Sequence, residues 1–306
     1  MPEQHLPPAW SKSSLANLLD GCAWQWALKK VFGLDDPGSP ATVRGVGFHA
    51  AIELHERTRL VRARDEYGPE LPTLEQMHDH GAAVIRAGAA ELPPSLWEAH
   101  GTEADRLVDE LWVLLGNWFD APYEAEGHAD PLSLRRRVLS WRPVAVEPYF
   151  RVALGRAMRP GHGYIDAIYW DGYRGEWVVV DQKSAGNFRR WEGPEGHELE
   201  AAMYVHGALK ARGLPVRGER VRMEWHIVRP IAPSSRTGPL ARVIELPMDG
   251  TEAEHRSIAE VSVAEQLVVD GYWPKNTAWN LCSPRWCAFY EGCEVTGELA
   301  PERMLG

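Results

Sequence analysis

Two acidic residues and a lysine interrupt apolar, strand-forming stretches near the middle of the chain. Gly163-Tyr164-Ile165-Asp166 is followed, fifteen residues after the aspartate, by Asp181-Gln182-Lys183. Side chains two residues apart in a strand share a face, so Asp181 and Lys183 should leave the strand together. An acid and a lysine in this arrangement could hold a metal ion and a water molecule at the end of a sheet.

The turn-like residues 171–175 predict a hairpin that sets the register of these acids. If Asp171 pairs with Glu176, a constant register pairs Asp166 with Asp181. Opposed Cβ atoms lie about 4.5–5.5 Å apart, where two carboxylates repel each other. At least one should then have a raised pKa without metal.

A divalent cation would offset this repulsion, and hard oxygen ligands suit Mg²⁺ or Mn²⁺. Such an ion polarises a phosphate and lowers the pKa of a bound water molecule, which Lys183 could orient or deprotonate. Lys183 could also stabilise the charge that grows on the phosphorane. The alternative is an ordinary ion pair between Asp166 and Lys183, with Asp181 capping a turn.

His49 follows a glycine-containing segment, Arg44-Gly45-Val46-Gly47-Phe48, and precedes Glu53 by four residues on one predicted helix face. It could be a further metal ligand, or an ordinary structural or exposed histidine. The motif H-E-x-x-H is absent, so a zinc hydrolase on this helix has little support.

Four cysteines form the second possible metal site. Cys282, Cys287 and Cys293 lie within twelve residues, and Cys22 is about 260 residues away. Four thiolates fit a [4Fe–4S] cluster or a structural Zn²⁺, and the lone distant cysteine favours the cluster over paired zinc knuckles. Four unrelated buried thiols remain the alternative, whereas disulfides are disfavoured in a reducing cytosol.

The composition is that of a soluble globular protein, with 44% hydrophobic residues and 14 tryptophans. No signal peptide or membrane span is recognised, so we expect a cytoplasmic protein without membrane contact. The net charge of −10 restricts any DNA contact to a local basic groove. Arg135-Arg136-Arg137, or Arg189 and Arg190 with Trp191, could bind backbone and stack bases, or form a solvated face.

Periodicity and helix breakers predict an α/β sandwich core with helical additions. The predicted helices are residues 11–32, with serine N-caps, 42–61, 74–121, broken at Pro93-Pro94, 196–212 and 252–269. The predicted strands are residues 144–154, 164–170, 177–180 and 221–228.

In this order the motifs resemble the RecB-type iron–sulfur branch of the PD-(D/E)XK nuclease superfamily: AddB nuclease domains, CRISPR-adaptation exonucleases and related phage exonucleases. Its first motif, a helical histidine after a glycine-containing turn, is matched by His49. The G-x-x-D and D/E-x-K motifs are matched by Asp166 and by Asp181 with Lys183. The acid on the preceding strand is matched by Glu147. The Q-x-x-x-Y helix is matched by Glu200 and Tyr204, with glutamate in place of the glutamine. The four cysteines match the cluster ligands of the branch, although C-x4-C stands here where many members have C-x2-C.

The resemblance implies a restriction-endonuclease-like fold, a mixed sheet flanked by helices. It implies Mg²⁺ or Mn²⁺ at His49, Asp166 and Asp181, and exonuclease action on DNA ends. Glu147, Glu200 and Tyr204 are accessory candidates. We expect residues 1–41 to carry the first cysteine, 42–270 to form the nuclease core with an insertion at about 74–121, and 271–306 to hold the other cysteines.

No P-loop motor motif occurs in the chain, so we expect it to act alone or to lend its nuclease to a partner. The resemblance implies DNA as the substrate, a role in recombination, repair or CRISPR adaptation, and recombination or CRISPR-adaptation proteins as such partners. Two other functions stay open. One is a non-catalytic iron–sulfur module that binds DNA ends within a larger complex. The other is a structure-specific endonuclease.

Overall fold

The fold is described from a computed structural model. It describes residues 6–34, 36, 38–65, 67–125, 128–156, 158–189, 191–214, 218–232 and 238–276, and four single residues, 282, 287, 289 and 293.

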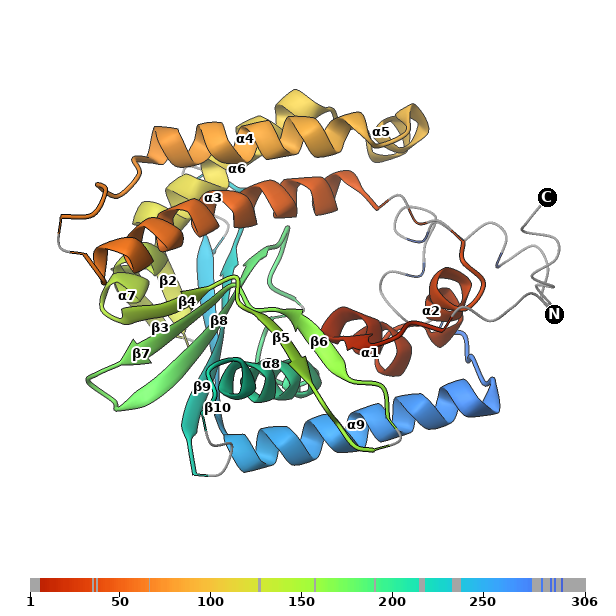
Figure 1. The fold of residues 1–306 in the computed structure, drawn as a ribbon. Helices are drawn as coiled ribbons and strands as arrows, with labels where there is room; N and C mark the ends of the chain where they lie inside the picture. Colours follow the sequence, from red (N-terminus) through yellow and green to blue (C-terminus); the bar gives the residue numbers. More distant parts are fainter. Residues whose placement is uncertain are drawn as a thin grey trace.

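A seven-stranded mixed sheet forms the centre of the molecule (Figure 1). Its strand order is β3-β2-β10-β9-β8-β7-β4. The pairs β8–β9 and β10–β2 are parallel and the others antiparallel. The strands are β2 (Pro122–Ala125), β3 (His128–Ser133), β4 (Arg142–Val146), β7 (Ala167–Asp171), β8 (Glu176–Ser184), β9 (Arg220–Val228) and β10 (Ala241–Asp249).

A second sheet of three short strands continues from the edge of the first, in the order β1-β6-β5. These strands are β1 (Trp10–Ser11), β5 (Tyr149–Val152) and β6 (Gly161–Tyr164). The antiparallel pair of β4 and β7 continues, through a bend, into the hairpin of β5 and β6. There Glu147 N–H donates to the Asp166 carbonyl at 3.0 Å, and Ile165 N–H donates to the Pro148 carbonyl at 3.2 Å.

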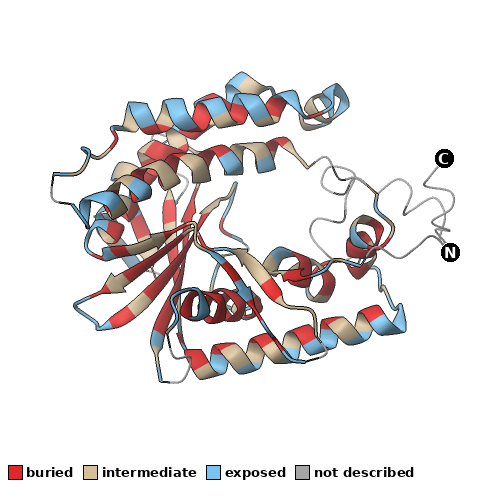
Figure 2. Cartoon of the chain, in the orientation of Figure 1, coloured by how far each residue is buried: buried red, intermediate tan, exposed pale blue. Residues whose placement is uncertain are grey.

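Helices cover both faces of the large sheet, and the central strands β8 and β9 are buried along most of their length (Figure 2). Val178 and Val180 pack toward one helical layer, whereas Val179 packs toward the other. The first layer holds α3 (Pro40–Arg62), α4 (Leu74–Ala90), α6 (Ala104–Asp120) and α7 (Leu134–Leu139). The second holds α1 (Lys12–Leu19), α2 (Ala23–Lys30), α8 (Glu198–Ala211) and α9 (Gly250–Asp270). The short α5 (Pro94–His100) follows α4.

The predicted α/β sandwich is confirmed, but several element boundaries are wrong. The predicted helix 11–32 divides into α1, which Ser11 caps as expected, and α2. Gly21 lies between them, where a Cβ would stand 2.8 Å from the Asn17 carbonyl oxygen. The insertion contains three helices instead of two.

The predicted strands 144–154 and 164–170 each break where the two sheets meet. The strands β1, β2, β3 and β10 and the helix α7 were not predicted.

Candidate active site

The bend between the two sheets brings acidic side chains toward α3. Glu147 adopts a left-handed backbone conformation, φ 49°, which is rare for a residue with a side chain. Its partner across the hairpin, Asp166, lies in a bend and not within a strand as expected. The expected hairpin register is confirmed from Asp171, which pairs with Glu176, to Ala167, which pairs with Val180. The strand pairing ends there, so the expected pair of Asp166 with Asp181 does not form.

Asp166 links α3 to the end of β8. Its Oδ2 accepts a hydrogen bond from the Gln182 backbone N–H at 2.6 Å and lies 3.2 Å from His49 Nδ1. Burial lowers the pKa of His49, but the Asp166 carboxylate outweighs burial and raises it. The residues expected to precede His49 in a turn, Gly45 and Gly47, lie instead within α3, which begins at Pro40.

Asp181 lies on the other side of β8, 1% exposed, and is surrounded by cations. Lys183 Nζ lies 2.5 Å from its Oδ2. Lys12, from the start of α1, donates to Oδ1 at 2.9 Å, and the Tyr204 hydroxyl of α8 donates to the same oxygen at 3.0 Å. The Lys12 ammonium also lies 4.0 Å from the centre of the Tyr204 ring.

Glu200 completes this charge cluster. Lys12 Nζ lies 2.5 Å from Glu200 Oε1, and Lys183 Nζ lies 3.7 Å from the same oxygen. The glutamate that replaces the family's glutamine therefore neutralises part of the charge of the two lysines.

Asp181 does not have the raised pKa that repulsion from Asp166 was expected to cause. Burial alone would raise it, but the ammonium groups of Lys12 and Lys183 hold the pKa of Asp181 well below its usual range. Lys183 in turn has a raised pKa, because Asp181 and Glu200 outweigh the effect of its burial. In the metal-free protein Lys183 is therefore an ammonium that can hold an anionic oxygen but cannot accept a proton.

The acid with an elevated pKa is Glu147. Burial raises the pKa of Glu147 to about 7, and the nearby carboxylates of Asp166 and Glu53 contribute. These three acids, with His49 and Gln182, line a cavity of about 10 Å³, which is near the smallest volume that can hold one water molecule.

The side chains at this site have the chemistry of ligands for a hard divalent cation. Asp181 Oδ2 and Gln182 Oε1 are buried and accept no hydrogen bond within the described residues, although Lys183 forms its ion pair with the former. Carboxylate and amide oxygens beside an imidazole suit Mg²⁺ or Mn²⁺. Among the described residues, however, no group of three or more His, Cys, Asp or Glu side chains is spaced to hold a metal ion as it stands.

Cys22, Cys282 and Cys293 lie close enough to Cys287 to affect its thiol, but the four described cysteines are not spaced to hold a metal ion as they stand. Burial raises the pKa of the Cys287 thiol, and the thiols of Cys22, Cys282 and Cys293 raise it further. Gln25 Nε2 lies 3.7 Å from Cys287 Sγ. The break between α1 and α2 leaves Cys22 in an extended conformation as the N-cap of α2, which turns it out of the helix.

The arginines expected to contact DNA differ in their surroundings. Arg137 donates to Glu224 and Glu245, so its guanidinium binds acids within the protein and does not face DNA. Arg135 lies over the Phe119 ring at 4.1 Å, and Arg136 is exposed.

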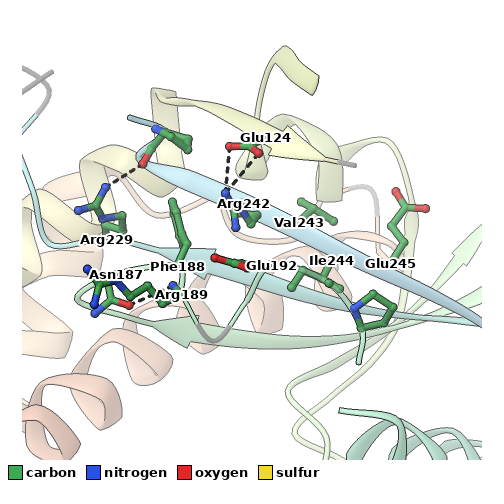
Figure 3. Close-up of a pocket in the computed structure, with 13 residues that line it drawn as sticks. Glu124, Asn187, Phe188, Arg189, Glu192, Arg229, Arg242, Val243, Ile244 and Glu245 are labelled. Carbon is green, nitrogen blue, oxygen red and sulfur yellow. Dashed lines mark hydrogen bonds and ion pairs between the residues drawn. The ribbon is translucent and has the colours of Figure 1, made fainter. Parts of the chain in front are cut away.

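Arg189 lines a pocket of about 540 Å³ beyond the end of β8 (Figure 3). The guanidinium groups of Arg229 and Arg242 lie 5.4 and 4.6 Å from the Phe188 ring in its wall. Trp191 stacks on His197 with ring centroids 4.4 Å apart. Arg190 lies outside the described residues.

A family model for the PD-(D/E)XK nuclease superfamily matches residues 9–294. The chain belongs to this superfamily. Membership supports a nuclease, a hydrolase of phosphodiester bonds, and the mixed sheet flanked by helices agrees with the restriction-endonuclease-like fold of PD-(D/E)XK proteins.

Other comparisons add little to the superfamily assignment. A solved structure titled "Crystal structure of SSO0001" is similar over 81% of this chain and 85% of that chain, with 17% sequence identity and a TM-score of 0.28, too low to support a conclusion. Curated proteins give no significant match. No helix in the described part of the chain is long and apolar enough to cross a membrane.

Sequence reasoning missed Lys12. Its position between Ser11 and Ser13 at a helix start carries no sign of a site 169 residues away. The one hint was that Lys12 is the single charged residue of α1.

Proposed function

We propose that this PD-(D/E)XK protein is a metal-dependent nuclease that hydrolyses DNA from its ends, with Asp181 and Lys183 at the end of β8 as the centre of its active site. The observation that carries the proposal is the cluster around Asp181. Lys183, Lys12 and Tyr204 all contact this buried carboxylate, and Asp166 is tied to the next residue, Gln182. A structural ion pair needs one lysine, whereas two lysines and a tyrosine converge on this one buried carboxylate.

His49, Asp166 and Asp181 would hold Mg²⁺ or Mn²⁺, with Glu147 and Glu200 as accessory acids. The ion would supply Lewis-acid polarisation of the phosphate and a water of lowered pKa. Lys183 holds a non-bridging phosphate oxygen, or the attacking water, and stabilises charge that develops in the transition state. Tyr204 fixes the orientation of Asp181 through its hydroxyl hydrogen bond.

Action on DNA ends and a place in the RecB-type iron–sulfur branch are proposals supported by the resemblance of the motifs. A cytoplasmic location stays a prediction. A [4Fe–4S] cluster at Cys22, Cys282, Cys287 and Cys293 belongs to the same proposal, with structural Zn²⁺ as the alternative. The division into residues 1–41, 42–270 and 271–306 and the recombination, repair or CRISPR-adaptation partners also stay predictions. Arg189, Arg190 and Trp191 are the proposed DNA contacts.

The first test compares cleavage of end-labelled linear DNA by the native chain, Asp181→Asn and Lys183→Ala, with Mg²⁺ and with Mn²⁺. Both variants should lose cleavage. Asp79→Asn is the matched control, because the Asp79 side chain is 86% exposed on α4. Melting curves establish that the variants are folded. Cleavage at the native rate by folded Asp181→Asn would disprove the proposed site.

Circular single-stranded DNA separates the two modes of cleavage. An exonuclease leaves it intact and degrades the same sequence after linearisation. An endonuclease cuts both forms, and a non-catalytic binding module cuts neither.

A further inference from the structure

Two tyrosines lie side by side on the outer face of the small sheet. Tyr149 of β5 pairs directly with Tyr164 of β6, and their ring centroids lie 5.2 Å apart with the ring planes inclined at 56°. Tyr149 is 47% exposed and Tyr164 60% exposed. Rings so exposed contribute little to the core, so packing does not explain them.

The other face of the same sheet is buried. Phe150 and Val152 are each 2% exposed, and Gly207 of α8 approaches Phe150 so closely that a Cβ would lie 2.6 Å from the ring. Since side chains alternate along a strand, Tyr149 and Arg151 share the outer face, and the exposed positions of β5 are visible in Figure 2.

This outer face, which also carries His162 opposite Arg151, leads directly into the candidate active site. Tyr164 precedes Asp166 by two residues, and Tyr149 follows Glu147 by two. Two residues of chain span at most about 7 Å even when they are fully extended, so both rings lie close to these acids. A nucleic-acid strand with a phosphate beside Asp166 would therefore carry its neighbouring nucleotides over the two rings.

We propose that Tyr149 and Tyr164 form a stacking platform for unpaired bases of the DNA strand held at the active site. The proposal rests on the proposed nuclease function and adds that single-stranded DNA is the substrate form that this surface binds. Every base has a flat face that can stack on an aromatic ring, and the Arg151 guanidinium on the same face can contact the phosphate backbone. Bases in a duplex cover one another, so a platform of this kind favours a strand whose bases are free.

The test uses the full chain with both tyrosines replaced, Tyr149→Ala with Tyr164→Ala. Binding of a fluorescently labelled single-stranded oligonucleotide and of a blunt duplex of the same sequence is followed by anisotropy, at one salt concentration and with EDTA. Loss of a stacked base should weaken single-strand binding by about 5- to 150-fold per ring, with duplex binding unchanged.

Two variants serve as controls. Tyr149→Phe with Tyr164→Phe keeps both rings and should bind single strands like the native chain. Tyr173→Ala removes a tyrosine that is 99% exposed in the turn between β7 and β8, and it should also bind like the native chain. Oligonucleotides that contain 2-aminopurine should show fluorescence quenching with the native and phenylalanine forms but not with the alanine form.

Native single-strand affinity of the folded double alanine variant would overturn the platform. An equal loss of affinity for single strands and duplex, or an equal loss in the phenylalanine variant, would also overturn it. Because binding is measured without divalent cations, the result does not depend on cleavage. If the native chain cleaves no DNA but the binding pattern holds, the proposed nuclease fails and the platform stands.

Discussion

At the scale of single residues, the charge of Asp181 is balanced from two directions. Lys183 comes from the same strand, whereas Lys12 comes from the start of α1 and lies only 19% exposed between Asp181 and Glu200. In the metal-free protein these ammonium groups supply the positive charge that a bound cation would otherwise bring. A divalent ion at Asp181 must therefore share this carboxylate with Lys12 or displace it.

Lys12→Met should destabilise the metal-free protein by about 2 kcal/mol, because a charged hydrogen bond to a buried carboxylate is lost. Mn²⁺ should then raise the melting temperature more in this variant than in the native chain, since the ion replaces the missing charge and binds the folded state. Lys29→Met is the control, because Lys29 pairs with Asp36 and is similarly exposed, 22%. Thermal melts with EDTA and with Mn²⁺ measure both effects, and equal Mn²⁺ shifts in all three proteins would contradict competition at Asp181.

At the scale of elements, α3 carries His49 and is positioned by close packing on α4. A Cβ at Gly47 would lie 2.4 Å from Ile85 Cγ1 and 2.9 Å from the Gly81 carbonyl oxygen. A Cβ at Gly81 would lie 2.6 Å from the Gly47 carbonyl oxygen. The glycines thus serve the contact between two helices, and the position of His49 depends on that contact.

Gly47→Ala should therefore cost about 1–3 kcal/mol of folding stability through overpacking, although alanine is the better helix former. Gly116→Ala in α6 is the matched change, because nothing lies within 4 Å of its added Cβ. It should stabilise the protein by about 0.5–1 kcal/mol. Urea denaturation measures both variants, and a stabilised Gly47→Ala protein would mean that α3 and α4 can separate without cost.

The strand β9 carries a buried row of ionisable residues, Arg222, Glu224 and His226, each at most 2% exposed. Arg137 donates to Glu224 Oε1 at 2.7 Å and to Glu224 Oε2 at 2.9 Å. His226 Nε2 lies 2.8 Å from Glu224 Oε2. Burial alone would raise the pKa of Glu224, but Arg137 and His226 hold it well below its ordinary value.

A lowered pKa in the folded state means that the pair stabilises the protein at neutral pH and that this contribution declines as pH falls below about 4.5, the ordinary value. Glu224→Gln should reduce this pH dependence and cost about 3–5 kcal/mol at pH 7, since it leaves Arg137 without its main partner. Glu70→Gln, at an exposed position, is the control. Urea unfolding from pH 3 to pH 7 gives the slopes, and identical slopes in the native and Glu224→Gln proteins would show that another group dominates acid unfolding.

At the scale of the whole molecule, the first helices meet the end of the described chain. The Trp26 ring lies 5.4 Å from that of Trp273, the Trp24 backbone N–H donates to the Pro274 carbonyl, and the Asn276 side chain donates to the Gly21 carbonyl. The four cysteines lie in the same region as these contacts. A cluster on their thiolates would therefore close a loop that spans nearly the entire chain.

We expect the protein to purify brown, with iron and acid-labile sulfide. Cys22→Ser should lose the cluster and melt at a lower temperature, because the unfolded state regains the freedom that a long-range link removes. Elemental analysis, sulfide assay and the visible absorption spectrum measure the cluster. Stoichiometric zinc without sulfide would favour the structural zinc site.

Sequence reasoning succeeded where the determining contacts are local. The turn at residues 171–175 fixed the β7–β8 register, and strand alternation put Asp181 and Lys183 on one side of β8. It failed at the bend of Glu147 and Asp166, where residues 144–154 were assigned to one strand although Pro148, a strand breaker, lies between the two apolar runs that belong to different sheets. It also missed β10, where Pro247 argues against a strand. That half of β10 pairs only with β9, so the missing N–H is tolerated.

The contact between the first and last described parts of the chain also determines when folding can be completed during synthesis. Trp10 Nε1 donates to Glu265, which lies 255 residues later. At about 5–20 residues per second, a ribosome needs about 13–50 s to make the residues between them. For that interval the tryptophans of the first helices lack their final partners. The nascent chain therefore exposes apolar surface at its start until its last part emerges, and a chaperone that shields this segment should increase the yield of folded protein.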